Sequence, residues 1–447
     1  MKVLLISANR LTSPYPVYPM GLDYVAGALS RHRVKIVDMN LHSRDSLLAI
    51  IDQYRPDVVG ISMRNIDNND AASPYGFIQE YKVLVDAVRS RTQAVLVVGG
   101  TGFSIFPEKI MTALPVDYGI VGEGERMAGL LDALEAGKPV NTLPGVVTPS
   151  ASCEFPSPLE AGPSRCFNPD EEHVSFYLKK GGMLNLQTKR GCPLRCIYCT
   201  YPHIEGRRLR LIPPETVAAT ARGLQDAGAR YLFIADSALN VHADHSLAVA
   251  EAFRDAGLTI PWGAFLAPMK MPDHYYDSLK AAGLTHAEFG TESLSNPVLS
   301  AYGKPFDRKQ VLISHEAALQ AGLHVAHYLL LGGPGETAET LDDTLTYAGK
   351  FKKTVFFVFC GMRIYPHTDL YIRARAEGKI DASRDLLEPV FYESSDITND
   401  DIIRRVKEKA GGRVNWIIGA GEEETSKVLS RMYERGRTGP LWEYLIR

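Results

Sequence analysis

The first third of the chain alternates apolar runs with amphipathic segments. The apolar runs span residues 2–7, 34–40, 57–62, 94–100 and 117–125, and their hydrophobic residues do not alternate regularly with polar ones. Such runs predict parallel strands that are covered on both faces. The segments between them, such as 21–31 and 77–89, have helical spacing. Strand and helix in strict turn predict an α/β fold, with a doubly wound, Rossmann-like parallel sheet over residues 1–145.

The pattern lapses over residues 146–180, where prolines cluster, and this predicts a linker. Six further apolar runs then span residues 183–188, 231–236, 261–266, 286–291, 324–332 and 355–364. Six strand and helix units are fewer than the eight of a complete barrel, so residues 181–375 are predicted to form a partial (βα)6 TIM-type barrel. The remaining residues, 376–447, are charged and have helical spacing, which predicts a small helical C-terminal domain.

The composition narrows the possible functions. Of the 447 residues, 45% are hydrophobic and 23% are charged, which is typical of a globular protein. The formal net charge of −3 includes no basic block, so nucleic acid is not expected as a partner. The apolar residues 3–6 are too few for a secretion signal, and no run reaches the ~18 apolar residues of a membrane span. We therefore expect a cytoplasmic protein without a membrane span.

Three of the six cysteines form a cluster in the sequence. Cys192, Cys196 and Cys199 have the spacing C-x3-C-x2-C and follow the first predicted barrel strand. Three thiolates on one loop can hold three corners of a 4Fe-4S cluster and leave the fourth iron open. A zinc knuckle with a fourth ligand from elsewhere, or three unrelated core cysteines, are the alternatives. The isolated cysteines are expected to be small buried residues, and they are Cys153, Cys166 and Cys360.

The cysteine motif, with Tyr198 directly before its third cysteine, resembles that of the radical S-adenosylmethionine (radical SAM) superfamily. The resemblance covers about residues 184–375. It implies that S-adenosylmethionine binds the open iron, and it places Tyr198 among the cofactor-binding residues. It also implies that an external donor of the flavodoxin or ferredoxin type supplies an electron, which breaks the sulfonium bond to give a 5′-deoxyadenosyl radical.

The same resemblance assigns further residues to S-adenosylmethionine. Asp236 and Ser237, after the second barrel strand, correspond to the contact with the methionine part. They depart from the usual Gly-Gly-Glu and are similar to the Asp-containing form of cobalamin-dependent members. Glu292, after the fourth strand, corresponds to the ribose contact, and Gly332 and Gly333 would let the backbone approach the ligand closely. Each of these residues, taken singly, could instead form a turn or cap a helix.

The loops that follow the N-terminal strands resemble those of the cobalamin-binding domain of cobalamin-dependent radical SAM enzymes. The residues that this resemblance assigns to cobalamin are Ser62, Arg64, Asn65, Gly99, Gly100, Thr101, Gly102, Gly122, Glu123 and Gly124. The nucleotide motifs G-x-G-x-x-G and G-x-x-x-x-G-K-[ST] are absent from the sequence. The motif D-x-H-x-x-G is absent too, so a histidine ligand below the cobalt is not expected.

Arg64 is the candidate catalytic residue of this domain. It follows a buried strand at the end where the lower face of the corrin should lie. A guanidinium stays protonated and cannot donate a lone pair to cobalt, so it would prevent a fifth ligand from binding. This arrangement resembles the branch of the family that methylates an aromatic ring. In the alternative interpretation, Arg64 forms an ion pair with Asp67 or Asp70.

These observations predict a cobalamin-dependent radical SAM methyltransferase. It would transfer a methyl group from S-adenosylmethionine, by way of cobalamin, to a carbon of a small-molecule or peptide substrate. A non-methylating rearrangement or cyclisation enzyme with the same two domains is one alternative. A cobalamin or iron-sulfur sensor is the other, and turnover of S-adenosylmethionine would separate a sensor from an enzyme.

The cysteine assignment predicts the metal content of the protein. The anaerobically purified chain should contain about four iron and four sulfide. Replacing Cys192, Cys196 and Cys199 together by Ala should abolish the visible absorbance of the cluster and the iron, whereas Cys360→Ala should leave both unchanged. A triple variant that keeps its iron would contradict the assignment.

Overall fold

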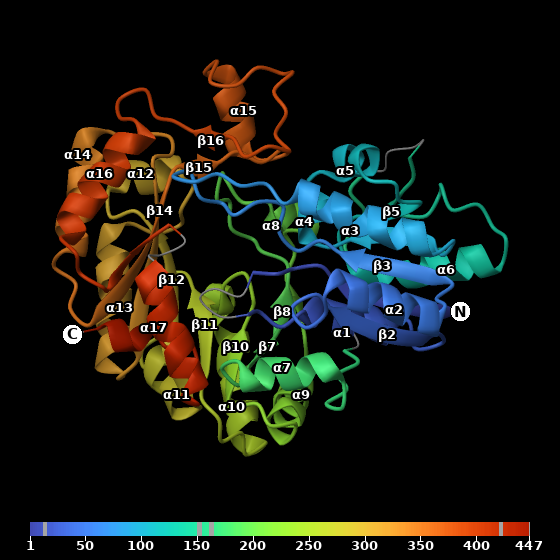
Figure 1. The fold of residues 1–447 in the computed structure, drawn as a ribbon. Helices are drawn as coiled ribbons and strands as arrows, with labels where there is room; N and C mark the ends of the chain where they lie inside the picture. The colour runs from blue at the N-terminus through green and yellow to red at the C-terminus, as the bar shows by residue number, and fades with distance from the viewer. Residues whose placement is uncertain (12–15, 150–153, 161–164, 420–422, 447) are drawn as a thin grey trace.

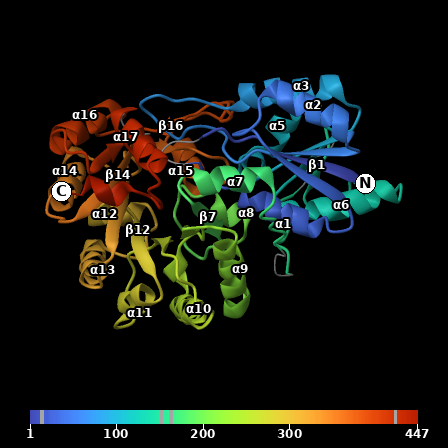
Figure 2. The same ribbon diagram turned by 60° about the horizontal axis from the view of Figure 1, so that its bottom comes forward.

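The computed structural model describes residues 1–11, 16–149, 154–160, 165–419 and 423–446. Within this part of the chain, two sheets with their own helices lie side by side, as Figures 1 and 2 show. Cys153 lies outside the described residues.

The N-terminal sheet has the strand order β2-β1-β3-β4-β5-β6. Its strands are β1 (Lys2–Ser7), β2 (Arg33–Asp38), β3 (Val58–Ser62), β4 (Val95–Gly99), β5 (Tyr118–Ile120) and β6 (Val146–Val147). Its helices are α1 (Met20–Ala28), α2 (Arg44–Tyr54), α3 (Ile78–Arg91), α4 (Thr101–Ile105), α5 (Pro107–Ala113), the 3-10 turn η1 (Gly124–Arg126) and α6 (Met127–Glu135). Strands β1–β5 are parallel, which confirms the five predicted strands, whereas β6 is antiparallel to β5 and lies in the segment predicted as a linker.

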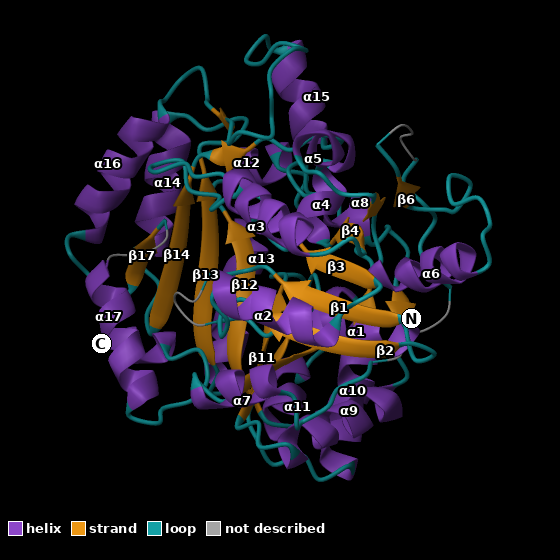
Figure 3. Ribbon diagram, turned by 45° about the vertical axis from the view of Figure 1, so that its right-hand side comes forward, coloured by secondary structure: helices purple, strands orange, loops and turns teal. Residues whose placement is uncertain are grey.

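Both faces of this sheet are buried, which explains its uninterrupted apolar runs. Leu4 and Ile6 of β1 face the hydrophobic core formed with α2 and α3, whereas Val3 and Leu5 face the core formed with α1 and α6. Successive side chains of a strand point to opposite faces, so a sheet covered on both sides needs apolar residues at consecutive positions. Figure 2 shows α2 and α3 on one side of β1 and α1 and α6 on the other, and Figure 3 shows the strands in orange.

The second sheet has the order β17-β14-β13-β12-β11-β10-β7. Its six predicted strands are confirmed as β7 (Met183–Leu186), β10 (Tyr231–Ile234), β11 (Trp262–Leu266), β12 (Leu284–Glu292), β13 (His324–Leu331) and β14 (Thr354–Cys360). The helices that follow or precede them are α9 (Pro214–Asp226), α10 (Ala243–Asp255), α11 (Tyr275–Ala281), α12 (Asn296–Ala301), α13 (Arg308–Gln320) and α14 (Ala338–Ala348). The strands are parallel, and the sheet is the predicted partial barrel.

Shorter elements lie near the start of the barrel. They are α7 (Glu172–Lys179), β8 (Lys189–Arg190), α8 (Tyr201–Ile204), β9 (Arg210–Leu211) and the 3-10 turn η2 (Leu239–Val241). Strand β8 pairs with β9 in an antiparallel hairpin that encloses the three clustered cysteines. None of the helices in the described part of the chain combines the length and apolar character that a membrane crossing requires.

The C-terminal segment is mainly helical, as predicted, but it also completes the barrel. Strand β15 (Met362–Arg363) and helix α15 (Asp369–Ala376) come just before it. Its own elements are β16 (Phe391–Tyr392), α16 (Asn399–Ala410), β17 (Trp416–Ile418), α17 (Glu423–Glu434) and the 3-10 turn η3 (Trp442–Leu445). Strand β17 pairs in parallel with β14 and adds a seventh strand that the sequence analysis did not predict. Trp442 packs against Ala326 and Val355, and its Nε1 donates a hydrogen bond to Glu288 Oε1 at 2.9 Å.

Candidate active site

The cysteine loop begins directly after the β8 strand and is fixed by the backbone around it. Cys192 N donates to Gly206 O at 3.0 Å, and Ile197 N donates to Tyr302 O at 3.1 Å. Leu370 N in turn donates to Ile197 O at 2.8 Å. The loop at the carboxyl end of β7 is therefore tied to both the fourth and the last unit of the barrel.

The three thiols of this loop are close enough to influence one another electrostatically. Burial raises the pKa of Cys196, and burial raises the pKa of Cys199 to about 12, with smaller contributions from the neighbouring cysteines. Without a metal, Cys196 and Cys199 would thus be neutral thiols. Metal binding replaces the thiol protons, and one buried and two partly buried thiols on one fixed loop are a donor set that fits the predicted 4Fe-4S cluster.

Glu292 lies beside this loop at the carboxyl end of β12. Its backbone has φ of 59°, in the left-handed region that residues with a Cβ seldom adopt, and such strained residues are concentrated at functional sites. Glu292 Oε1 accepts a hydrogen bond from the Tyr198 hydroxyl at 2.5 Å and an ion pair from Lys304 Nζ at 2.8 Å. Glu292 Oε2 is buried and has no hydrogen-bond partner among the described residues. One carboxylate oxygen is thus available to a ligand hydroxyl, and the ribose contact of Glu292 stays a prediction.

Asp236 differs from Glu292 in its hydrogen bonding, because both of its carboxylate oxygens already accept hydrogen bonds from the protein. It accepts hydrogen bonds from Thr188 N at 2.8 Å, Thr188 Oγ1 at 2.5 Å and Lys189 Nζ at 2.6 Å. Ser237 Oγ donates to Gly191 O at 3.3 Å. These bonds fix the start of the cysteine loop, and the contact of Asp236 and Ser237 with S-adenosylmethionine stays a prediction.

The glycines after β13 are needed for packing within the protein. Gly332 has φ of 89°, and a Cβ added there would lie 2.7 Å from Asn399 Oδ1. Gly333 N donates to the Tyr302 hydroxyl at 3.0 Å. This tight packing brings the backbone after β13 close to Tyr302, so the predicted ligand contact of the two glycines is a second role that stays a prediction.

A cavity of about 410 Å³ lies where the two sheets face each other. Most residues that the sequence analysis assigned to cobalamin line it, namely Ser62, Arg64, Gly99, Gly100, Thr101, Gly122, Glu123 and Gly124. The barrel contributes Asn185, Gln187, Arg190, Tyr201, Ile204, Glu205 and Ala235. The cavity also reaches Gly60, Val97 and Ile120 inside the N-terminal domain, so it extends as a slot along one face of that sheet.

Asn65 and Gly102 are not among the residues that line this cavity, but they shape the loop beneath it. Asn65 O accepts a hydrogen bond from the Tyr81 hydroxyl at 2.7 Å, and Gly102 N donates to Met63 O at 2.9 Å. Gly100 has φ of 99°, and a Cβ there would lie 2.7 Å from Met63 O. A larger residue at position 100 would therefore push the β3 and β4 loops apart.

The sequence analysis left two interpretations of Arg64, a position below the cobalt and an ion pair with Asp67 or Asp70. Arg64 lines the cavity, and its backbone oxygen accepts a hydrogen bond from Thr101 Oγ1 at 2.6 Å. The carboxylate of Asp67 is bound by Arg363 Nε at 2.8 Å and by the Tyr365 hydroxyl at 3.3 Å. Asp67 therefore joins the N-terminal domain to the segment that follows the barrel strand β14, a role that the sequence analysis did not foresee.

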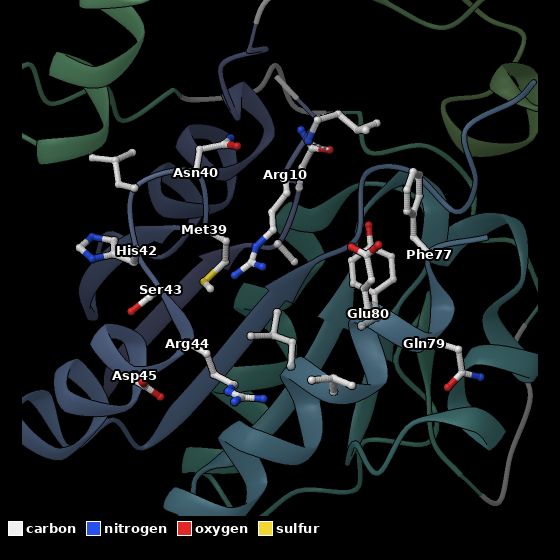
Figure 4. A pocket seen from close by; sticks show the side chains of 17 residues that line it. Arg10, Met39, Asn40, His42, Ser43, Arg44, Asp45, Phe77, Gln79 and Glu80 are labelled. Atoms are coloured by element: carbon white, nitrogen blue, oxygen red, sulfur yellow. Dashed lines mark hydrogen bonds between the residues drawn. The ribbon is translucent and has the colours of Figure 1, made fainter. Parts of the chain in front are cut away.

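A second, larger cavity of about 1170 Å³ lies beyond the carboxyl ends of β1 and β2, next to α3. Figure 4 shows Arg10 after β1, Met39–Asp45 after β2, and Phe77 and Glu80 at the start of α3 around it. Its lining includes none of the residues that the sequence analysis assigned to a cofactor. Its size alone therefore does not make it the active site.

The isolated cysteines have different surroundings. Cys360 is buried, as expected, but Cys166 is exposed, because the segment around it runs over the surface near α1. The prediction of a buried position was therefore wrong for Cys166. The five cysteines in the described part of the chain are all free thiols.

Two family descriptions match the two sheets. Residues 6–131 match the B12 binding domain, and residues 186–348 match the radical SAM superfamily. The chain is a cobalamin-dependent radical SAM enzyme.

Relatives of this radical SAM enzyme include the tryptophan 2-C-methyltransferase of Streptomyces laurentii, which is 27% identical over 82% of this chain and 73% of that protein. The cytidylyl-2-hydroxyethylphosphonate methyltransferase of Streptomyces wedmorensis is 24% identical over 80% of this chain and 79% of that protein. The radical S-adenosylmethionine methyltransferase TsrM from Kitasatospora setae, solved with tryptophan and an S-adenosylmethionine analogue, has the same fold. Its TM-score is 0.85 at 20% identity, and the match covers 99% of this chain and 97% of that one.

The two domains of the radical SAM enzyme are joined by ion pairs at the edge of the cavity. Glu123 Oε1 accepts hydrogen bonds from Arg190 Nη1 at 2.9 Å and from Arg210 Nη1 at 2.5 Å, and Glu123 Oε2 accepts one from Leu159 N at 2.6 Å. Arg190 also pairs with Glu125 at 2.7 Å. The side chain of Glu123 therefore connects the N-terminal domain to the β8–β9 hairpin, and its predicted contact with cobalamin stays a prediction.

The pKa of Glu123 makes this connection depend on pH. Burial raises that pKa, but the hydrogen bonds from Arg210, Leu159 and Arg190 outweigh burial, so the pKa is lowered below its usual value of 4.5. A carboxyl whose pKa is lower in the folded state stabilises the fold above its unfolded pKa, and this contribution is lost as the pH falls through the folded value.

Glu123→Gln should therefore destabilise the apoprotein at pH 7, by about 1.5–3 kcal/mol for charged hydrogen bonds. The difference in thermal unfolding midpoint between the variant and the wild type should shrink as the pH falls below about 4.5. Differential scanning calorimetry measures both midpoints, with Glu251→Gln on the exposed face of α10 as the control. An equal shift for both variants, or a difference that does not change with pH, would contradict this role of Glu123.

Proposed function

We propose that the enzyme transfers a methyl group from S-adenosylmethionine to a carbon atom of a small-molecule substrate. The observation that supports this most directly is the shared cavity: the glycine-rich loops of the N-terminal sheet and the residues around the cysteine loop line the same space. The tryptophan and cytidylyl-2-hydroxyethylphosphonate relatives described above are both named as methyltransferases. In this arrangement a substrate would meet the cobalamin domain on one side and the cluster domain on the other.

The residues that would hold each group are separate. Cys192, Cys196 and Cys199 would hold the cluster, and the loops after β3, β4 and β5 would hold cobalamin. When bound, these groups and S-adenosylmethionine supply methyl-transfer and radical chemistry that side chains cannot perform. The protein fixes their positions through the paired carboxylates Glu123 and Asp236, and it offers Glu292 Oε2 as an acceptor.

The inner face of the barrel provides a wall for the substrate. Phe265, Tyr328, Phe357 and Phe359 are only partly buried, whereas their neighbours on the outer face, such as Leu329 and Val358, are completely buried. Tyr328 stacks on Phe357 with a centroid distance of 4.7 Å. Partly buried aromatic rings inside a barrel indicate a hollow with apolar walls, so we propose a substrate with an aromatic or apolar part, as in the relative named for tryptophan.

The proposed reaction also requires an electron source and a reducing environment. An external donor of the flavodoxin or ferredoxin type would supply electrons to the cluster. Free thiols at all the described cysteines suit the reducing conditions of the cytoplasm, where we propose that the enzyme acts.

The proposed position of Arg64 predicts a spectroscopic result. Enzyme-bound Co(II) cobalamin should show no nitrogen superhyperfine splitting in its EPR spectrum, because a protonated guanidinium cannot be a ligand. Arg64→His should introduce this splitting. Arg44→His, a matched change in the larger cavity, should leave the spectrum as it is. A spectrum unchanged by Arg64→His would favour the ion-pair interpretation of Arg64.

Methyl transfer itself is tested with S-adenosylmethionine that has a deuterated methyl group. Incubated with the substrate, the enzyme should give a product with a labelled methyl group and an equal amount of S-adenosylhomocysteine. 5′-Deoxyadenosine beside them would indicate hydrogen abstraction from an sp3 carbon, and its absence would indicate polar transfer to an electron-rich ring. If 5′-deoxyadenosine accumulates while no methyl group is transferred, the rearrangement alternative replaces the methyltransferase.

A further inference from the structure

Lys304 is a buried lysine beside the cysteine loop that the sequence analysis did not identify. It follows α12, and its side chain is 5% exposed. Its ammonium nitrogen lies 3.4 Å from Cys196 Sγ, 2.9 Å from the Tyr198 hydroxyl and 2.8 Å from Glu292 Oε1. These three groups come from the cysteine loop and from the end of β12, so Lys304 joins the two parts of the site.

The backbone explains why Lys304 reaches the cysteine loop. Tyr302, two residues earlier, is completely buried, and its hydroxyl donates to Leu330 O at 3.1 Å. Tyr302 O accepts the hydrogen bond from Ile197 N, which lies between Cys196 and Tyr198. The segment that leads to Lys304 is therefore fastened to the same loop that its ammonium group contacts.

The charges around Lys304 indicate a role that depends on the cluster. A buried ammonium group is stable only when it is paired and hydrogen-bonded. Glu292 supplies one negative charge, and Cys196 supplies a second when its thiol proton is replaced by iron. Hydrogen bonds to the sulfurs and the net charge around an iron-sulfur cluster set its reduction potential. A fixed positive charge favours the reduced cluster, because reduction adds one negative charge.

We propose that Lys304 is a positioning residue that raises the reduction potential of the cluster and orients Glu292. It donates a charge-assisted hydrogen bond to the Cys196 thiolate. It also binds Glu292 Oε1, which leaves Oε2 as the oxygen that faces the ligand. This inference rests on the proposed cluster site but requires no methyl transfer for its test.

The test compares full-length enzymes that contain a reconstituted cluster, without substrate or S-adenosylmethionine. Lys304→Met removes the positive charge and the hydrogen-bond donors but keeps a side chain of similar length. Lys304→Arg keeps the charge and the donors. The fraction of reduced cluster is followed by EPR at a series of fixed solution potentials. We expect Lys304→Met to lower the ratio of reduced to oxidised cluster about tenfold at a given potential, which corresponds to 59 mV for one electron. Lys304→Arg should stay close to the wild type.

Lys309→Met, on the exposed surface of α13, is the matched control and should leave the potential unchanged. If Lys304→Met does not retain iron, Lys304→Gln replaces it, because glutamine keeps a donor without the charge. A midpoint potential equal to that of the wild type in an uncharged variant with full iron content would overturn the proposal. Absence of iron from the wild type itself would instead overturn the cluster assignment, so the two failures are distinguishable.

Discussion

The carboxylate of Glu123 is the interaction on which the arrangement of the site depends. It binds Arg190 and Arg210, which are paired opposite each other across the β8–β9 hairpin, and that hairpin encloses the cysteine loop. The side chains of Glu123 and Arg190 are almost completely buried, so water screens their attraction little. Removing one partner would leave an unpaired buried charge, which is the costly state for such networks. The distance between the two halves of the cavity is thus fixed by charge pairing.

A second set of buried charges surrounds the cysteine loop. Lys189 binds Asp236 below its start, and Lys304 binds Glu292 on its other side. The two carboxylates differ, because both oxygens of Asp236 accept hydrogen bonds within the protein, whereas Glu292 Oε2 has no hydrogen-bond partner in the described part of the chain. A carboxylate at the carboxyl end of a barrel strand can therefore support the loop or receive a ligand, and its neighbours decide which.

The C-terminal segment closes the amino end of the barrel. Trp442 packs inside the barrel and binds Glu288, whose other oxygen accepts a hydrogen bond from the Tyr328 hydroxyl at 2.8 Å. His286 lies 3.1 Å from Glu443 on the same side. A segment that the sequence presents as a helical appendage thus shapes the barrel interior next to the partly buried aromatic residues.

The sequence by itself determined the main strands, the cysteine motif and the glycine-rich loops. Burial on both faces imposes long apolar runs on central strands, and metal ligation imposes short spacing on cysteines. The sequence did not reveal β6 and β17, which have only two and three residues and are stabilised by pairing with the neighbouring strands. Only the tertiary structure decided that Lys304 contacts Cys196, which is 108 residues away along the chain, and that Asp67 binds Arg363, which is 296 residues away. Charge pairing depends on distance in space, and spacing along the chain does not show it.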